Sequence, residues 1–151
     1  MIFIPGNVPS LKNSKQISTV AGKPVLLYSK TVTKYLQKLG IQRLSSRTGI
    51  TGYKTRQNLF KQTINGFFDD APTPCVLGFN FVRDSKRVFD FHNACQIICD
   101  LLVAHGAIKD DDIKHLIPVP MMINGSWYSI SRDNPGVYLK IITDYNLNFE
   151  V

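Results

Sequence analysis

Short apolar runs along the chain predict a series of β-strands. Each run is bounded by Pro, Gly, Asn, Asp or Ser, residues that favour turns. The strands predicted in this way cover residues 1–4, 25–28, 75–82, 113–122, 127–131 and 136–143. Asn124-Gly125 is a typical hairpin turn, so we expect it to join the fourth and fifth of these strands.

Three other segments carry apolar residues at helical spacing. They predict helices over residues 30–39, 57–68 and 90–105. Ser29 is suited to cap the first helix, and Gly40 and Gly106 lie where the first and third should end. Residues 7–18 and 41–56 show neither period, and we expect them to form basic loops. Strands and helices alternate without a regular βαβ pattern, which predicts an α+β fold with helices packed on a sheet.

Length and composition indicate one globular domain. The chain has 151 residues, of which 44% are hydrophobic and 19% are charged, so we expect a single domain over residues 1–151. Its longest uncharged stretches are interrupted by Pro, Asn and Gly, and no membrane span is expected. The first nine residues lack the pattern of a secretory signal, and the three cysteines are expected to be reduced thiols. We therefore expect a cytoplasmic protein.

The charge is divided unevenly along the chain. The first 87 residues carry fourteen basic and three acidic residues, a net +11, whereas the remaining residues carry four basic and eight acidic ones, a net −4. A surface rich in Lys and Arg gains affinity for nucleic acid by displacing counterions from phosphates. The basic half therefore favours a nucleic-acid partner, and a solvated basic face is the alternative.

The acidic half holds two clusters that flank the third predicted helix. Asp90-Phe91-His92-Asn93 opens this helix, and Asp110-Asp111-Asp112 follows its end. Within the helix, Asn93, Gln96 and Asp100 share one polar stripe. Gathered carboxylates repel one another unless a cation such as Mg²⁺ neutralises them, which is the arrangement that metal-assisted phosphodiester cleavage needs. The spacing alone favours a helix-capping acid at Asp90 and a solvated turn at Asp110 to Asp112, because short acidic runs are more often turns than sites.

These residues resemble the RusA-like Holliday junction resolvases. The family's signature is an Asp-x-Asp-Asn segment opening a helix, an Asp-Leu pair on that helix, and an Asp-Asp pair after it. Here the matching residues are Asp90 to Asn93, Asp100-Leu101, and Asp110-Asp111 after Gly106. The amino-terminal Pro9-Ser10-Leu11-Lys12-Asn13 is similar to the family's Pro-Pro-Ser-x-Asn opening, and the resemblance spans about residues 2–120 with a longer insertion at about 40–70.

The resemblance implies a two-layer sandwich in which helices cover one face of a mixed sheet. It also implies a homodimer that binds a four-way DNA junction and nicks two strands symmetrically in recombination and repair. The implied cofactor is Mg²⁺, with Mn²⁺ as an alternative, and no organic cofactor is implied. Asp90, His92 and Asp111 would be the catalytic residues, and Asp90, Asp111 and Asp110 the metal ligands.

The remaining implied roles concern DNA binding and support of the site. Asn93, Gln96 and Asp100 would support the metal ligands. The DNA-binding residues would be Lys12, Asn13, Lys15, Lys23, Lys86 and Arg87. Two residues depart from the family pattern: His92 replaces its second Asp, and Gln96 replaces a functional Lys. These departures weaken the expectation of cleavage more than that of the fold.

Three alternatives remain open. The chain could bind DNA junctions without cleaving them, or it could bind single-stranded nucleic acid. Cys95 and Cys99 could contribute to a zinc site, but the paired C-x-x-C spacing of such sites is absent and small thiols on an apolar helix are usually core residues. Trp127 and Tyr128 are expected in the core, with stacking on a base as the alternative.

Overall fold

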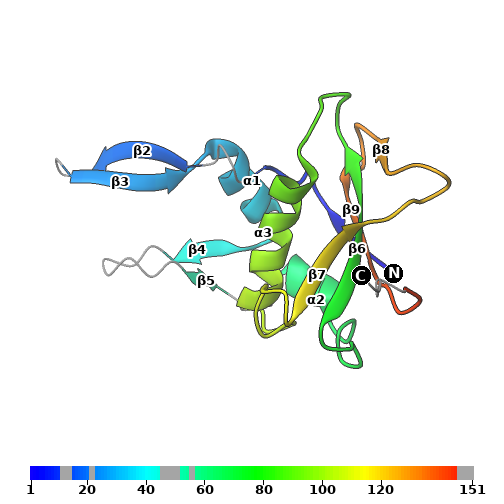
Figure 1. Ribbon diagram of the computed structural model, residues 1–151. Coiled ribbons are helices and arrows are strands. Elements are labelled where there is room, and N and C mark those ends of the chain that lie inside the picture. Colours follow the sequence, from blue (N-terminus) through cyan, green and yellow to red (C-terminus); the bar gives the residue numbers. More distant parts are fainter. Residues whose placement is uncertain (11–14, 21–22, 45–51, 55–56, 146–151) are drawn as a thin grey trace, which may run out of the picture.

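The structure is a computed structural model that describes residues 1–10, 15–20, 23–44, 52–54 and 57–145, and within 15–28 and 42–54 the backbone only. In this part of the chain a mixed sheet is covered by helices on one side, an α+β arrangement (Figure 1). None of the described helices is both long and apolar enough to span a membrane.

The main sheet is built around one long buried strand. Strand β6 (Cys75–Arg83) lies between β9 (Gly136–Ile141), which is antiparallel to it, and a parallel edge formed by β7 (Leu116–Pro120) and β8 (Tyr128–Ile130). Strand β1 (Ile2–Pro5) pairs antiparallel with the far side of β9. The carboxyl end of β6 therefore leads out of the sheet beside β8, toward the helical layer.

Strands β7 and β8 do not form the predicted hairpin with each other. They pair one after the other with the same edge of β6, β7 with its first half and β8 with its last three residues. Asn124 and Gly125 do form a turn, with φ of 51° and 77°, but it closes a small excursion between the two strands. The buried side chain of Asn80 donates to the carbonyls of Met121 and Ser126 at 2.9 Å, and this fixes the excursion to β6.

Two further hairpins replace parts of the loops expected from the sequence. Strands β2 (Lys15–Val20) and β3 (Lys23–Tyr28) form one, and β4 (Gln42–Leu44) and β5 (Gly52–Lys54) form the other. In Figure 1 both extend away from the main sheet on the helical side. The expectation of loops at residues 15–18, 42–44 and 52–54 is therefore wrong. These strands form by backbone pairing within each hairpin, although their sequences lack the alternation of apolar and polar residues that predicts a strand.

The three described helices begin at side-chain caps. Helix α1 (Lys30–Lys38) begins at Ser29, whose Oγ accepts from the Val32 N–H at 3.4 Å, as predicted. Helix α2 (Leu59–Ile64) begins at Asn58, and α3 (Phe91–Ala104) begins at Asp90. Gly40 and Gly106 follow α1 and α3 with φ of 71°, the left-handed conformation that ends a helix at low cost in glycine.

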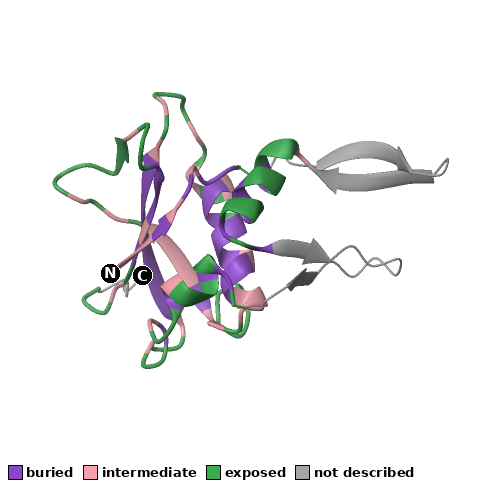
Figure 2. Cartoon of the chain, turned by 180° about the vertical axis from the view of Figure 1, so that it is seen from behind, coloured by how far each residue is buried: buried purple, intermediate pink, exposed green. Residues whose placement is uncertain are grey.

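The hydrophobic core lies between the sheet and the helices, as the burial colours of Figure 2 show. Strand β6 contributes Leu77, Phe79 and Phe81, and α3 contributes an almost continuous apolar surface that includes Ile97 and Leu101. Cys95 and Cys99 are buried free thiols of this surface. Because α3 is packed so closely along the sheet, the polar residues at its two ends occupy fixed positions.

Candidate functional site

Asp90 lies where the connection from β6 meets the first turn of α3. Its carboxylate Oδ1 accepts from the Asn93 N–H at 3.3 Å, so the side chain caps the helix and is exposed to solvent. The positive end of the helix dipole attracts a negative charge at this position. In the described part of the chain, no Lys, Arg or His nitrogen lies within ion-pair distance of it. Asp90 therefore presents a fixed anionic oxygen to solvent.

His92 occupies the first turn of α3 and is exposed. Its ring lies 5.6 Å from that of Phe91, nearly perpendicular to it. Further along the helix, Asn93 and Asp100 are half-buried and Gln96 is exposed. The predicted polar stripe is thus present beside the buried apolar face.

Asp111 lies close enough to α3 to act on a buried thiol of that helix. Burial is the largest cause that raises the pKa of Cys99 to about 12, and the negative charges of Asp111 and Asp100 raise it further. Cys99 lies in the second half of α3, so the charge of Asp111 reaches that part of the helix. Asp111 and Asp100 therefore both act electrostatically on the same thiol of α3.

The three consecutive aspartates do not have equal surroundings. Asp110 Oδ1 accepts from the Asp111 N–H at 2.8 Å. Asp112 Oδ1 accepts from His115 Nδ1 at 2.6 Å and from the Lys114 N–H at 2.9 Å, and the hydrogen bond with His115 is the main cause that lowers the pKa of Asp112. Asp112 is thus engaged within its own turn, whereas the exposed carboxylate of Asp111 has no ion pair with a described residue.

The donor chemistry suits a hard divalent cation, although a closed ligand set is not assembled. Mg²⁺ is commonly held by one or two carboxylates, with water and phosphate oxygens completing its shell. Asp90 and Asp111 offer exposed carboxylates of this kind. Within the described ranges, however, no three His, Cys, Asp or Glu side chains are grouped closely enough to hold a metal by themselves.

The predicted DNA-binding residues fall into three groups. Lys86 and Arg87 are exposed in the connection between β6 and α3, a few residues before Asp90. Lys15 and Lys23 are the first residues of β2 and β3, where the backbone alone is described. Lys12 and Asn13 lie outside the described residues.

Arg83, which sequence reasoning missed, connects the amino-terminal segment to this region. Its Nη1 donates to the carbonyl of Val8 at 2.6 Å, and its guanidinium lies 4.8 Å from the centre of the Phe89 ring. Burial lowers the pKa of Arg83, and the neighbouring Asp84 opposes this effect. The segment that precedes Lys12 and Asn13 is therefore held at the same end of β6 as Asp90.

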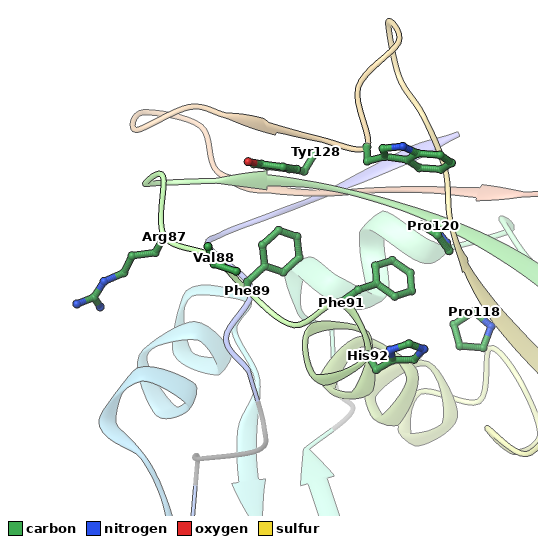
Figure 3. A pocket seen from close by; sticks show the side chains of 9 residues that line it. Arg87, Val88, Phe89, Phe91, His92, Pro118, Pro120 and Tyr128 are labelled. Atoms are coloured by element: carbon green, nitrogen blue, oxygen red, sulfur yellow. The ribbon is translucent and has the colours of Figure 1, made fainter.

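A mostly apolar cavity of about 500 Å³ opens beside the start of α3 (Figure 3). We call it the aromatic cavity, and its main lining residues are Arg87, Phe89, Phe91, His92, Trp127 and Tyr128. Trp127 and Tyr128 are 56% and 48% exposed, so the expectation that they belong to the core is wrong. Trp127 lies just before β8 and Tyr128 is its first residue. Among the described strands β8 pairs only with the end of β6, and all three of its residues are exposed.

Comparisons with protein-family models, with curated proteins and with solved structures find no match to this chain.

Proposed function

We propose that the protein is a divalent-metal-dependent endodeoxyribonuclease that resolves four-way DNA junctions, with a RusA-like fold and a homodimeric assembly. The observation that carries the proposal is the placement of two aspartates along one helix. Asp90 is fixed at the start of α3, and the charge of Asp111 acts on Cys99 in the second half of the same helix. Both carboxylates are exposed, and Lys86 and Arg87 lie just before the helix.

Asp90 and Asp111 would hold Mg²⁺ or Mn²⁺, with Asp110 and His92 as neighbouring donors. The bound ion would polarise the phosphodiester and lower the pKa of an attacking water. The N-cap hydrogen bond orients the Asp90 carboxylate, and Asn93 supplies the N–H that fixes it. Exposed cations at Lys86 and Arg87 would bind the phosphates on either side of the cleaved bond.

The two departures from the family pattern change how this site would act. A neutral imidazole at His92 reduces the negative charge available to a metal, and imidazole is a better ligand for Mn²⁺ than for Mg²⁺. Gln96 is exposed and uncharged, so it supplies no cation for the developing charge. Lys86 and Arg87 are the described cations nearest in sequence to Asp90, and we propose that they supply this charge.

The second candidate is a junction-binding protein that has lost cleavage. The observation that favours it is that exposed His92 and Gln96 occupy the positions on α3 where the resemblance implies an Asp and a Lys. This candidate keeps the exposed Lys86 and Arg87 and the aromatic cavity, and it differs only in the chemistry at Asp90 and Asp111.

A cleavage assay separates the two candidates. A labelled four-way junction and a matched linear duplex are incubated with Mg²⁺, Mn²⁺ or EDTA and with wild type, Asp90→Asn or Asp70→Asn. Asp70 is an exposed acid that precedes β6, at the opposite end of that strand from Asp90, and serves as the matched control. We expect paired symmetric nicks in the junction that require metal, disappear in Asp90→Asn and persist in Asp70→Asn. Tight junction binding without nicks in either metal would favour the second candidate.

A further inference from the structure

We propose that the aromatic cavity receives an unpaired nucleobase of the DNA substrate. This inference rests on the proposed function in taking DNA as the ligand, and it assigns to Trp127 and Tyr128 a role in holding that DNA. It concerns binding alone and applies equally to a protein that cleaves the junction and to one that only binds it.

The floor of the cavity is rigid. The Phe91 ring meets Phe79 and Phe81 edge to face, at centroid distances of 6.3 and 6.0 Å, and is thereby fixed to β6. The Phe89 ring packs at 5.8 Å and 78° against Tyr128 and lies under the guanidinium of Arg83. A site whose side chains are ordered in advance loses less conformational entropy when a ligand binds.

The opening of the cavity presents aromatic surface to solvent. About half of Trp127 and of Tyr128 is exposed although both line the cavity. In Figure 3 the Tyr128 ring lies across from Phe89 and Phe91, and Pro118 and Pro120 of β7 close one end. The volume of about 500 Å³ falls within the range of roughly 300–1,000 Å³ that is common for small-molecule sites. A planar ring could therefore enter between aromatic walls.

The charges around the cavity favour a nucleic acid as its occupant. Arg87 lies at one end, with its guanidinium extending outward in Figure 3, and Lys86 precedes it. Among the residues that the structure describes, no Asp or Glu lines the cavity. Aromatic faces combined with cations are the features that bind unpaired bases and their phosphates. A purely apolar protein segment would leave these cations without partners.

The position of the cavity relates this binding to the candidate cleavage site. His92 lines the cavity, and Asp90 caps the same helix two residues earlier. A base held between Phe91 and Trp127 would bring its own phosphate to the start of α3. Bases at the crossover of a four-way junction can leave their stack more readily than bases within a duplex, because unstacking is least costly where pairing is already disturbed. The cavity would thus favour branched DNA without reading its sequence.

Trp127 is the single tryptophan of the chain, so its fluorescence reports on this cavity directly. The full-length protein is titrated in EDTA, so that no cleavage occurs, with a four-way junction, a matched duplex and a single-stranded thymidine oligomer. We expect the junction and the oligomer to quench the fluorescence and the duplex to leave it nearly unchanged. Placing abasic sites at the crossover should remove the quenching by the junction.

Variants test whether the aromatic rings contribute to binding. Trp127→Ala and Tyr128→Ala should each weaken junction binding in a gel-shift assay by roughly 5- to 150-fold, the range reported for a stacked base. Tyr145→Ala, at an exposed tyrosine after β9, is the matched control and should leave binding unchanged. Circular dichroism of each variant verifies that the fold is retained, as expected for positions with exposed side chains.

Junction binding without quenching, or with unchanged affinity in both variants, would overturn the inference. A fluorescence change that depends on protein concentration and accompanies dimer formation without DNA would also overturn it, because a second copy would then cover the cavity. Quenching without metal-dependent nicks in the cleavage assay would support the inference and refute the nuclease proposal. Metal-dependent nicking without quenching would support the nuclease proposal and overturn the inference about the cavity.

Discussion

Asn58 and His105 form a buried contact between α2 and the end of α3, and its removal tests how the helices are held. Asn58 is 5% exposed, and its Oδ1 accepts from the Lys61 N–H at 2.7 Å to cap α2. Its Nδ2 donates to His105 Nε2 at 3.0 Å. His105 Nδ1 donates to the Leu101 carbonyl at 2.8 Å. Because the Asn58 Nδ2 amide can only donate, His105 Nε2 must be the unprotonated, accepting nitrogen. The imidazole in this contact is therefore neutral.

The magnitude of the effect follows from these two hydrogen bonds. Losing an Asn cap costs about 0.5–2 kcal/mol. Leaving the half-buried His105 Nε2 without its donor adds about 1 kcal/mol, the lower end of the cost of an unsatisfied polar group. We therefore expect Asn58→Ala to lower the free energy of unfolding by about 1.5–3 kcal/mol. Asn58→Asp keeps the cap acceptor and removes only the donor, so it separates the two contributions.

The two variants should differ most clearly in their dependence on pH. Burial lowers the pKa of His105 below its ordinary value. The hydrogen bond to the Leu101 carbonyl raises this pKa, and the charge of Lys61 lowers it, so that the net shift is downward. In the wild type, His105 of the unfolded chain takes up a proton at higher pH than His105 of the folded chain. The contribution of neutral His105 to the free energy of unfolding is therefore fully present above about pH 6.5 and is lost as the pH falls through the folded-state pKa. In Asn58→Asp the new carboxylate favours imidazolium and raises the folded-state pKa, so this contribution is present below about pH 6.5 and is lost as the pH rises.

Urea denaturation of both proteins at several pH values between about 5 and 8 measures this difference. We expect the free energy of unfolding of Asn58→Asp to rise relative to that of the wild type as the pH falls. Asp69 and Lys61, which line the same surface hollow as His105, remain in both proteins, so their contributions largely cancel. A difference that does not vary with pH would refute the assignment of a neutral, hydrogen-bonded His105.

Three further predictions concern the candidate site and its surroundings. Asp111→Asn should abolish junction cleavage while affinity stays equal or increases, because one charge that repels phosphate is removed; normal nicking by this variant would refute the assigned role. Lys12→Ala should flatten the salt dependence of DNA binding by up to about one unit of slope, whereas Lys114→Ala in the acidic half should leave the slope unchanged; equal slopes in both would remove Lys12 from the contacts. Arg83→Met should lower the free energy of unfolding by about 1–3 kcal/mol, because the Val8 carbonyl loses its donor, and the exposed Arg132→Met is the control in the same denaturation assay.

The elements with strong local signals were predicted most accurately. Helix α3 begins at Asp90 and is followed by Gly106, as expected, because its cap, apolar spacing and terminating glycine all lie within the segment itself. Strand β6 agrees closely with the prediction for residues 75–82. Helix α2 is shorter than predicted because Asn58 caps it one residue after the expected start and Gly66 ends the segment with φ of 71°.

The errors occur where distant residues decide the structure. The Asn124-Gly125 turn was predicted correctly, but its strands pair with β6 because Asn80, more than forty residues away, binds the intervening carbonyls. The Asn58–His105 contact joins residues 47 positions apart, and no local pattern marks it. For the same reason the sequence could not show that Trp127 and Tyr128 remain exposed, since an aromatic pair in a strand is equally compatible with burial.

The segment from Phe89 to His92 explains why the candidate site and the aromatic cavity lie together. Extended backbone at Asp90, with φ of −90° and ψ of 120°, directs successive side chains to opposite sides. Phe89 and Phe91 therefore turn toward the sheet and the cavity, while the Asp90 carboxylate turns to solvent and caps the helix. A single residue inserted here would exchange these two sides and move the acid into the apolar layer. The spacing of these residues thus constrains core packing, helix capping and the proposed DNA contact at the same time.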